Sequence, residues 1–237
     1  MLAHKFEILL GSDEEKAAVL TLEEFKRLKR EALYGRNGIR NLAIIYFSFF
    51  SALRVTELAK LKIKDVIDRD GSIKEQFRLP SAYTKNKESR WAYILEQEHQ
   101  GAIKDYLKLR YEKRRRVSDK SEYLGMQADS PLFLARGNSG FTYRIKEYKK
   151  ADGTIANYSV CASLQQLLSD LVKTVTNKGA SSHSGRRTFA TRLAERGVDL
   201  EFIKYFLGHK SKQQTLAYID SDPKKGRMIL KNIYGEF

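Results

Sequence analysis

Apolar side chains recur every three or four residues along most of the chain, which is the spacing of one buried helix face. The clearest helix start is at Thr21, where Thr21-Leu-Glu-Glu24 forms a capping box. Only three prolines occur in 237 residues, which favours long helices. The pattern predicts helices over residues 21–35, 38–52, 56–61, 97–116, 162–176, 184–196, 199–207 and 223–233, with a short one after Ser211.

The spacing changes to strand-like segments in two stretches. Residues 63–67, 73–79 and 89–95 indicate an antiparallel sheet of three strands, and residues 141–148 and 154–160 indicate a second hairpin. The expected fold class is therefore mainly α with a small antiparallel β-sheet (α+β). Residues 1–20 are expected to be an N-terminal arm or linker, 21–222 one domain, and 223–237 a C-terminal helix.

Charge points to a polyanionic partner. The chain has 44 lysines and arginines against 29 acidic residues, a net charge of +15. Such an excess suits nucleic acid, although a solvated basic surface is the plainer alternative. Cys161 is the only cysteine, which excludes an intrachain disulfide and favours a reducing, cytoplasmic setting. Residues 39–50 are apolar but too short to cross a bilayer, so no membrane contact is expected.

Two segments in the first half of the chain combine cations with sharp turns. Arg54 follows an apolar helix and precedes another helix, although arginine at such a junction is usually a surface or capping residue. Lys85 lies in Thr84-Lys-Asn-Lys87 at a strand junction. A lysine there either protects a sheet edge or reaches into a DNA groove.

Two further segments lie near the C-terminus. His183-Ser-Gly-Arg186 places histidine and arginine on one face at a helix start, where phosphate is attracted. Leu207-Gly-His209 precedes Tyr218 by nine residues. Taken alone, Tyr218 is one of 13 tyrosines and is interpreted as a partly buried aromatic residue.

The order of these segments resembles the tyrosine recombinase or phage integrase family, which includes the Xer recombinases. Leu53-Arg-Val-Thr-Glu-Leu58 is similar to its first arginine box, and Thr84-Lys-Asn-Lys87 to its β-hairpin lysine. His183 to Thr191, with Leu207-Gly-His209 and Tyr218, is similar to its second box. The resemblance covers about residues 20–222 and implies the catalytic domain of that family.

The resemblance implies a nucleophilic tyrosine that forms a 3′-phosphotyrosyl intermediate, without ATP. Tyr218 takes this role, and Arg54, Arg186 and His209 donate to the phosphate oxygens. His183 accepts the tyrosine proton, Lys85 protonates the leaving 5′-oxygen, and Glu57 orients the site. The sequence contains no evident acidic cluster that could hold two metal ions, so neither a metal ion nor another cofactor is expected.

Double-stranded DNA is the expected partner, with a tetramer forming on it. The C-terminal helix would dock on a neighbouring subunit or pack within its own chain. The cations expected to bind DNA are Lys87, Arg90, Arg114, Arg115, Arg116 and Arg187. The expected location is the nucleoid.

Three departures from the family pattern are visible. Gly185 stands where relatives have leucine, which predicts a loss of packing. The interval from Lys85 to His183 is long and indicates an insertion near residues 136–160. Twenty residues are too few for the family's N-terminal helical domain, so either an excised catalytic domain or a minimal recombinase, like the short fimbrial-switch relatives, is expected.

Other functions remain open at this point. A type IB topoisomerase uses similar chemistry, and a catalytically idle DNA-binding regulator could use the same scaffold. A metal-dependent nuclease is a third alternative, distinguished by its sensitivity to EDTA.

Overall fold

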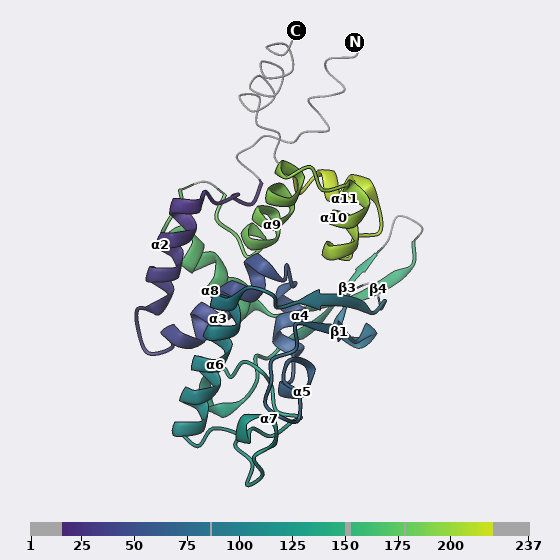
Figure 1. Ribbon diagram of the computed structural model, residues 1–237. Helices are drawn as coiled ribbons and strands as arrows, with labels where there is room; N and C mark the ends of the chain where they lie inside the picture. Colours follow the sequence, from purple (N-terminus) through teal and green to yellow (C-terminus); the bar gives the residue numbers. More distant parts are fainter. Residues whose placement is uncertain (1–15, 86, 150–152, 178, 220–237) are drawn as a thin grey trace, which may run out of the picture.

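Helix α3 (Gly38–Phe50) lies at the centre of the fold in the computed structural model, which describes residues 16–85, 87–149, 153–177 and 179–219 (Figure 1). Nine of the residues of α3 are buried. A helix that is apolar on nearly all sides needs neighbours around it. Helices α2 (Leu22–Leu33), α6 (Gln97–Glu112) and α9 (Ser184–Glu195) pack against it.

The other elements surround this centre. In Figure 1, α9, α10 and α11 form the upper part of the molecule and α5 and α7 the lower part. The strands of the described residues form two antiparallel pairs, β1 with β2 and β3 with β4, which confirms the expected mainly helical class. The remaining bounds are α4 (Val55–Lys60), α5 (Ile63–Val66), β1 (Gln76–Leu79), η2 (Ser81–Tyr83), β2 (Arg90–Tyr93), α7 (Glu122–Gly125), η3 (Arg136–Asn138), β3 (Arg144–Lys149), β4 (Ile155–Val160), α8 (Ala162–Lys173), α10 (Leu200–Leu207) and α11 (Lys212–Leu216).

The first predicted strand is wrong, because residues 63–66 form helix α5. The Asp65 carboxylate accepts a hydrogen bond from the backbone N–H of Lys62 at 2.8 Å and caps this turn. Ile63 and Val66 are then buried one helical turn apart. A short apolar run is ambiguous between the two periods, and here the local cap favours the helix. The first sheet accordingly has two strands, with Phe77 opposite Ala92.

The other local predictions agree more closely with the structure. The capping box of Thr21 and Glu24 is present, and Asp199 caps α10. The hairpin predicted around Gly153 is β3–β4, with Arg144 opposite Val160. The helix predicted over residues 223–233 lies outside the described residues.

Gly185 allows α9 to approach α3 closely. A Cβ atom at this position would lie 2.3 Å from Ser48 Oγ and 2.8 Å from the Ser48 backbone carbonyl carbon. The expected loss of packing is therefore wrong, since glycine here permits a tighter helix contact. This contact sets α9, and Arg186 with it, against the end of α3.

The packed domain begins before Thr21. Ala18 and Leu20 are buried in the main core, and the Leu20 N–H donates to Thr188 Oγ1 at 3.0 Å. Residues 16–20 are thus tied to the packed domain through a contact with α9. The rest of the expected arm lies outside the described residues. Within the described ranges, no helix combines the length and apolar character needed to cross a bilayer.

Candidate active site

Five of the predicted catalytic residues stand at or near helix ends that converge beside the C-terminal turn of α3. Helix ends carry unpaired backbone groups, so they hold polar side chains firmly when packed together. The residues are Arg54 at the start of α4, His183 and Arg186 at the start of α9, His209 after α10 and Tyr218 after α11.

Glu57 lies fully buried between two arginines. Its Oε1 accepts from Arg54 Nη1 at 3.0 Å, and its Oε2 accepts from Arg90 Nη2 at 2.6 Å. Burial alone would raise the pKa of Glu57, but the charges of Arg90, Arg54 and Arg186 outweigh it and lower the pKa below its ordinary value. Glu57 is therefore a carboxylate that fixes the arginines.

The end of α10 holds the same two arginines from the other side. Arg54 Nη2 donates to the Gly208 carbonyl and Arg90 Nη1 to the Phe206 carbonyl, both at 2.9 Å. Gly208 has φ of 59°, and a Cβ atom there would lie 2.6 Å from Arg90 Cδ. Glycine thus serves both the left-handed helix end and the close approach of Arg90.

Arg186 is almost completely buried, and its donors are directed by backbone carbonyls. Nη1 donates to the Ala52 carbonyl, and Nη2 donates to the Leu207 carbonyl at 2.8 Å. Ala52 has φ of 49°, an unusual value for a residue with a Cβ atom. Burial, followed by the charge of Arg54, lowers the pKa of Arg186 to about 9, so it stays charged at neutral pH.

His209 is neutral and bridges Arg186 to α11. Its Nε2 lies 3.2 Å from Arg186 Nη2, and its Nδ1 lies 3.1 Å from Thr215 Oγ1. A guanidinium only donates, so Nε2 accepts and the ring proton is on Nδ1. Burial, and then the charge of Arg186, lowers the pKa of His209 to about 3.

Tyr218 contacts both histidines. Its hydroxyl lies 3.0 Å from His183 Nδ1, and its ring centroid lies 4.8 Å from that of His209. Burial, and then the charges of Arg186, Arg54 and Lys85, lowers the pKa of His183. A neutral imidazole is placed to accept the tyrosine proton. Thr191 Oγ1 donates to the Tyr218 carbonyl at 3.3 Å and ties this segment to α9.

Lys85 lies on the turn between β1 and β2. Its Nζ is 5.5 Å from the centroid of the Tyr158 ring on β4. Thr84 anchors the turn by donating to the Glu88 carbonyl at 2.8 Å. The charge of Lys85 reaches His183, whose pKa it helps to lower.

The cations expected to bind DNA separate into two groups. Arg90 and Arg187 are buried, and Arg187 Nη1 donates to the Ala17 carbonyl. Their placement does not fit the expected contact with the DNA backbone, because both guanidinium groups are used inside the fold. The exposed or half-exposed members are Lys87, Arg114, Arg115 and Arg116.

Sequence reasoning missed several supporting residues. Arg90 was assigned to DNA, and Thr215 and Ala52 were not singled out. The position of Thr215 one turn after the Ser211 cap was a usable signal for a residue facing His209. His99, which lies outside every motif of the sequence and would be expected at the surface, is buried instead: its ring stacks on Tyr46 in the core, and burial lowers its pKa to about 3.

The described residues contain no group of three or more histidine, cysteine or acidic side chains arranged to hold a metal ion. Glu57 is the carboxylate of the site, and both of its oxygens are occupied by arginines. The two arginines that contact Glu57 place positive charge at this site.

Known proteins resemble this chain over most of its length. A tyrosine recombinase of Agathobacter rectalis is 28% identical over 197 residues, which are 83% of this chain and 53% of the relative. The type 1 fimbriae regulatory protein FimE of Escherichia coli is 23% identical over 207 residues, 87% of each protein. This chain spans about half the length of the first curated relatives that it matches.

Solved structures share the fold. The crystal structure of XerA recombinase aligns with a TM-score of 0.64 and 24% identity, over 91% of this chain and 64% of that one. The XerH recombinase bound to its difH substrate aligns with a TM-score of 0.62 and 18% identity, over 90% of this chain and 51% of that one. The family model described as "Phage integrase family" matches residues 18–225. The chain therefore belongs to the phage integrase family, the family of the tyrosine recombinases.

Proposed function

We propose that this protein is a site-specific recombinase that cuts and rejoins double-stranded DNA through Tyr218. The observation that carries the proposal is the 3.0 Å contact between the Tyr218 hydroxyl and His183 Nδ1, next to Arg54, Arg186 and His209. A hydroxyl beside a base and a set of fixed cations is the arrangement required for attack on a phosphodiester.

In the first step, Tyr218 Oη bonds to phosphorus while the bond from phosphorus to the 5′-oxygen breaks. The hydroxyl proton passes to His183, and Lys85 supplies a proton to the departing 5′-oxygen. The products are a 3′-phosphotyrosyl bond and a free 5′-hydroxyl. Rejoining reverses the step with the 5′-hydroxyl of a partner strand, so the bond energy is retained without ATP.

Arg54 is suited to bind the nonbridging oxygens. Its Nη1 and Nη2 each carry two hydrogens, and each uses one, for Glu57 and Gly208 respectively. One hydrogen remains on each nitrogen, and the side chain is 19% exposed. These two donors match the two oxygens of a phosphate.

His209 would donate to the phosphate only after a change of partner. In this structure its Nε2 accepts from Arg186. A bound phosphate would take the Arg186 hydrogen bond and its negative charge would favour a protonated Nε2. We infer that His209 becomes a donor when DNA binds, and that the arginines replace a metal ion in stabilising the charge.

The names of the similar proteins support DNA strand exchange over the alternatives. XerH was solved with its difH substrate after cleavage, and an integrase of the Tn1549 transposon was solved with transposon DNA. We propose the same class of partner here, with the enzyme acting as a tetramer through residues 223–237. Arg114 and Lys87 are exposed to solvent, which suits contacts to the DNA backbone.

The test is a covalent trap. A pool of nicked duplexes with randomised sequence is incubated with protein in EDTA, denatured, and separated on a gel that shows labelled DNA bound to protein. Wild type should form an adduct without metal, and Tyr218→Phe should form none. No wild-type adduct, an adduct that requires metal, or an adduct with Tyr218→Phe would each overturn the proposal. Sequencing the trapped DNA gives the target site.

A further inference from the structure

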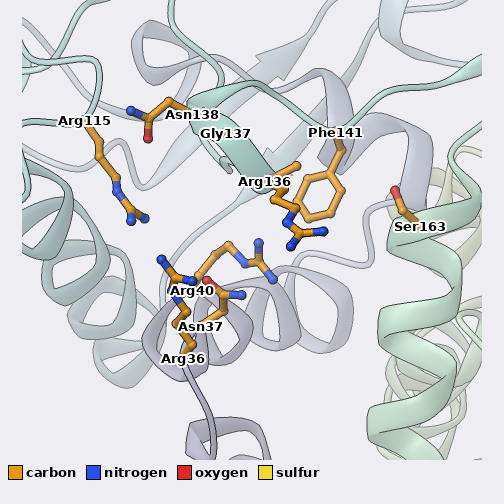
Figure 2. Close-up of a pocket in the computed structure, with 10 residues that line it drawn as sticks. Arg36, Asn37, Arg40, Arg115, Arg136, Gly137, Asn138, Phe141 and Ser163 are labelled. Carbon is orange, nitrogen blue, oxygen red and sulfur yellow. The ribbon is translucent and has the colours of Figure 1, made fainter.

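A second cationic site lies at the opposite end of α3 from the Tyr218 site. A cavity of about 690 Å³ opens between the start of α3, the loop after α6, the turn η3 and the start of α8 (Figure 2). We call it the arginine pocket; its polar lining includes Arg36, Asn37, Arg40, Arg115, Arg136 and Ser163. Figure 2 shows the side chains of Arg115 and Arg136 directed toward those of Arg36 and Arg40.

The charge of the arginine pocket is not balanced within the fold. Its lining residues include no acidic side chain, and none of its four arginines is ion-paired with a carboxylate among the described residues. Like charges that converge without a counterion repel one another. An anion between them would relieve that repulsion.

Arg40 forms a fixed base for such an anion. Its Nη1 donates to the Leu134 carbonyl at 2.9 Å, its Nη2 donates to Asn41 Oδ1 at 2.9 Å, and its guanidinium carbon lies 5.3 Å from the Phe141 ring centroid. Arg36 and Arg136 are exposed at the mouth of the cavity. The pocket therefore combines one rigid cation with others that can close on a ligand.

Two helix starts add partial positive charge. Asn37 is the N-cap residue of α3, and Ser163 is the second residue of α8. Neither helix has a side-chain cap or an acidic residue in its first turn. The N-terminal ends of both helices thus carry partial positive charge that favours the same anion as the arginines.

The surroundings favour a long polyanion over a small phosphate compound. An adjoining cavity is lined by Lys113 together with Arg36, Arg40 and Arg115, so the cationic surface continues past the pocket. The one aromatic side chain of the lining, Phe141, is buried beneath Arg40.

The spacing of the two sites fits one duplex. α3 has 13 residues, so at about 1.5 Å per residue its ends are ~18 Å apart. Arg186 contacts the Ala52 carbonyl just beyond the C-terminal end of α3. Base pairs are about 3.4 Å apart, so this separation corresponds to roughly five base pairs. We propose, on the basis of the function proposed above, that the arginine pocket binds a backbone phosphate of the DNA that Tyr218 cleaves.

The test measures duplex binding and its dependence on salt. Arg36→Gln/Arg136→Gln is compared with wild type by fluorescence anisotropy on a labelled 30-base-pair duplex. The expected result is about tenfold weaker binding and a salt slope smaller by about 1. Lys104→Gln/Lys108→Gln, on the exposed face of α6 and outside both cavities, removes the same two charges and should bind like wild type. Circular dichroism checks that each variant is folded.

The outcomes separate the two proposals. If wild type binds duplex and forms the Tyr218 adduct, but the pocket variant binds with the same affinity and slope, the pocket proposal is wrong and the catalytic one stands. If inorganic phosphate raises the Tm of wild type but not of the variant, with duplex binding unchanged, the pocket holds a free phosphate instead. If wild type forms no adduct, the function proposed for Tyr218 fails.

Discussion

The two arginine clusters at the ends of α3 differ in how their guanidinium groups are held. Around Tyr218, Arg186 is 1% exposed and its donors are fixed by backbone carbonyls and His209. In the arginine pocket, Arg36 and Arg136 are exposed, and Arg40 alone is held by several hydrogen bonds. The donors of the first cluster are already fixed around the point where charge would develop, whereas the exposed arginines of the second can adjust to a ligand.

This difference assigns the clusters different physical roles. Fixed donors in a buried site stabilise a transition state because they need no rearrangement when charge develops. Exposed cations attract a phosphate backbone, and their effect depends on salt. Changes near Tyr218 should therefore alter the rate of adduct formation, and changes in the pocket should alter DNA affinity.

The largest effect is expected for Arg186→Lys. Lysine has one ammonium group and cannot replace the guanidinium that donates to Ala52, Leu207 and His209. Adduct formation at saturating DNA should fall by roughly 10²–10³-fold, measured under single-turnover conditions.

Arg187→Lys is the matched control, because Arg187 is the next residue on α9 and is also buried. It should lower stability and leave the rate per folded molecule near that of wild type. An equal loss of adduct rate in Arg186→Lys and Arg187→Lys would show that both changes act through folding alone, and that the fixed donors of Arg186 have no separate role.

The second effect is expected for Glu57→Gln. This change leaves the partly exposed Arg54 and the buried Arg90 without their shared carboxylate, and should lower the free energy of unfolding by roughly 3–5 kcal/mol. Misplacement of Arg54 should also slow adduct formation about tenfold or more. Urea unfolding and the single-turnover rate measure the two effects. Glu201→Gln, an exposed carboxylate paired with Lys204 and Lys212, should change neither.

Arg90 and Arg187 show what the sequence could not provide. Lysine and arginine look alike in a charge pattern whether they face solvent or a buried carboxylate. The partners of Arg90, Glu57 and the Phe206 carbonyl, come from distant parts of the chain. Burial of a charge is a tertiary property, so the predicted DNA contacts were the least reliable assignments.

The residues proposed as catalytic, apart from Lys85, were more predictable because each stands at or near a helix end. Capping residues and glycines mark such ends locally, as Gly208 does before His209. Their order along the chain then matched one family. The arginine pocket had no such signal, because Arg36 and Arg136 meet only after the chain folds.

A third prediction concerns pH and separates the clusters by distance. His183 accepts a proton only when neutral, and its pKa is lowered from 6.5 by burial, then by Arg186, Arg54 and Lys85. The adduct rate should therefore be level above pH 6.5 and fall only as the pH drops below it. Because the pKa of His183 is lower in the folded protein than in the unfolded chain, the unfolded chain takes up the proton at higher pH. His183 therefore makes the free energy of unfolding fall as the pH drops below 6.5.

The pH profile of Arg36→Gln/Arg136→Gln should match that of wild type. The pocket and the Tyr218 site lie at opposite ends of α3, whose length of ~18 Å exceeds the Debye length of ~8 Å at physiological salt. A rate that already halves above pH 6.5 in wild type, or a shifted profile in the pocket variant, would contradict this separation.

The smallest effect is expected for Arg115→Gln, which tests whether the pocket selects among neighbouring cations. Arg115 lines both cavities, whereas Arg114 is exposed and lines neither. Both substitutions remove one charge from consecutive residues. Arg115→Gln should weaken duplex binding by about two- to fivefold, and Arg114→Gln by less, because a cation near a bound phosphate contributes more than one in solvent. Equal losses in the anisotropy titration would mean that net charge, rather than the shape of the pocket, attracts the DNA.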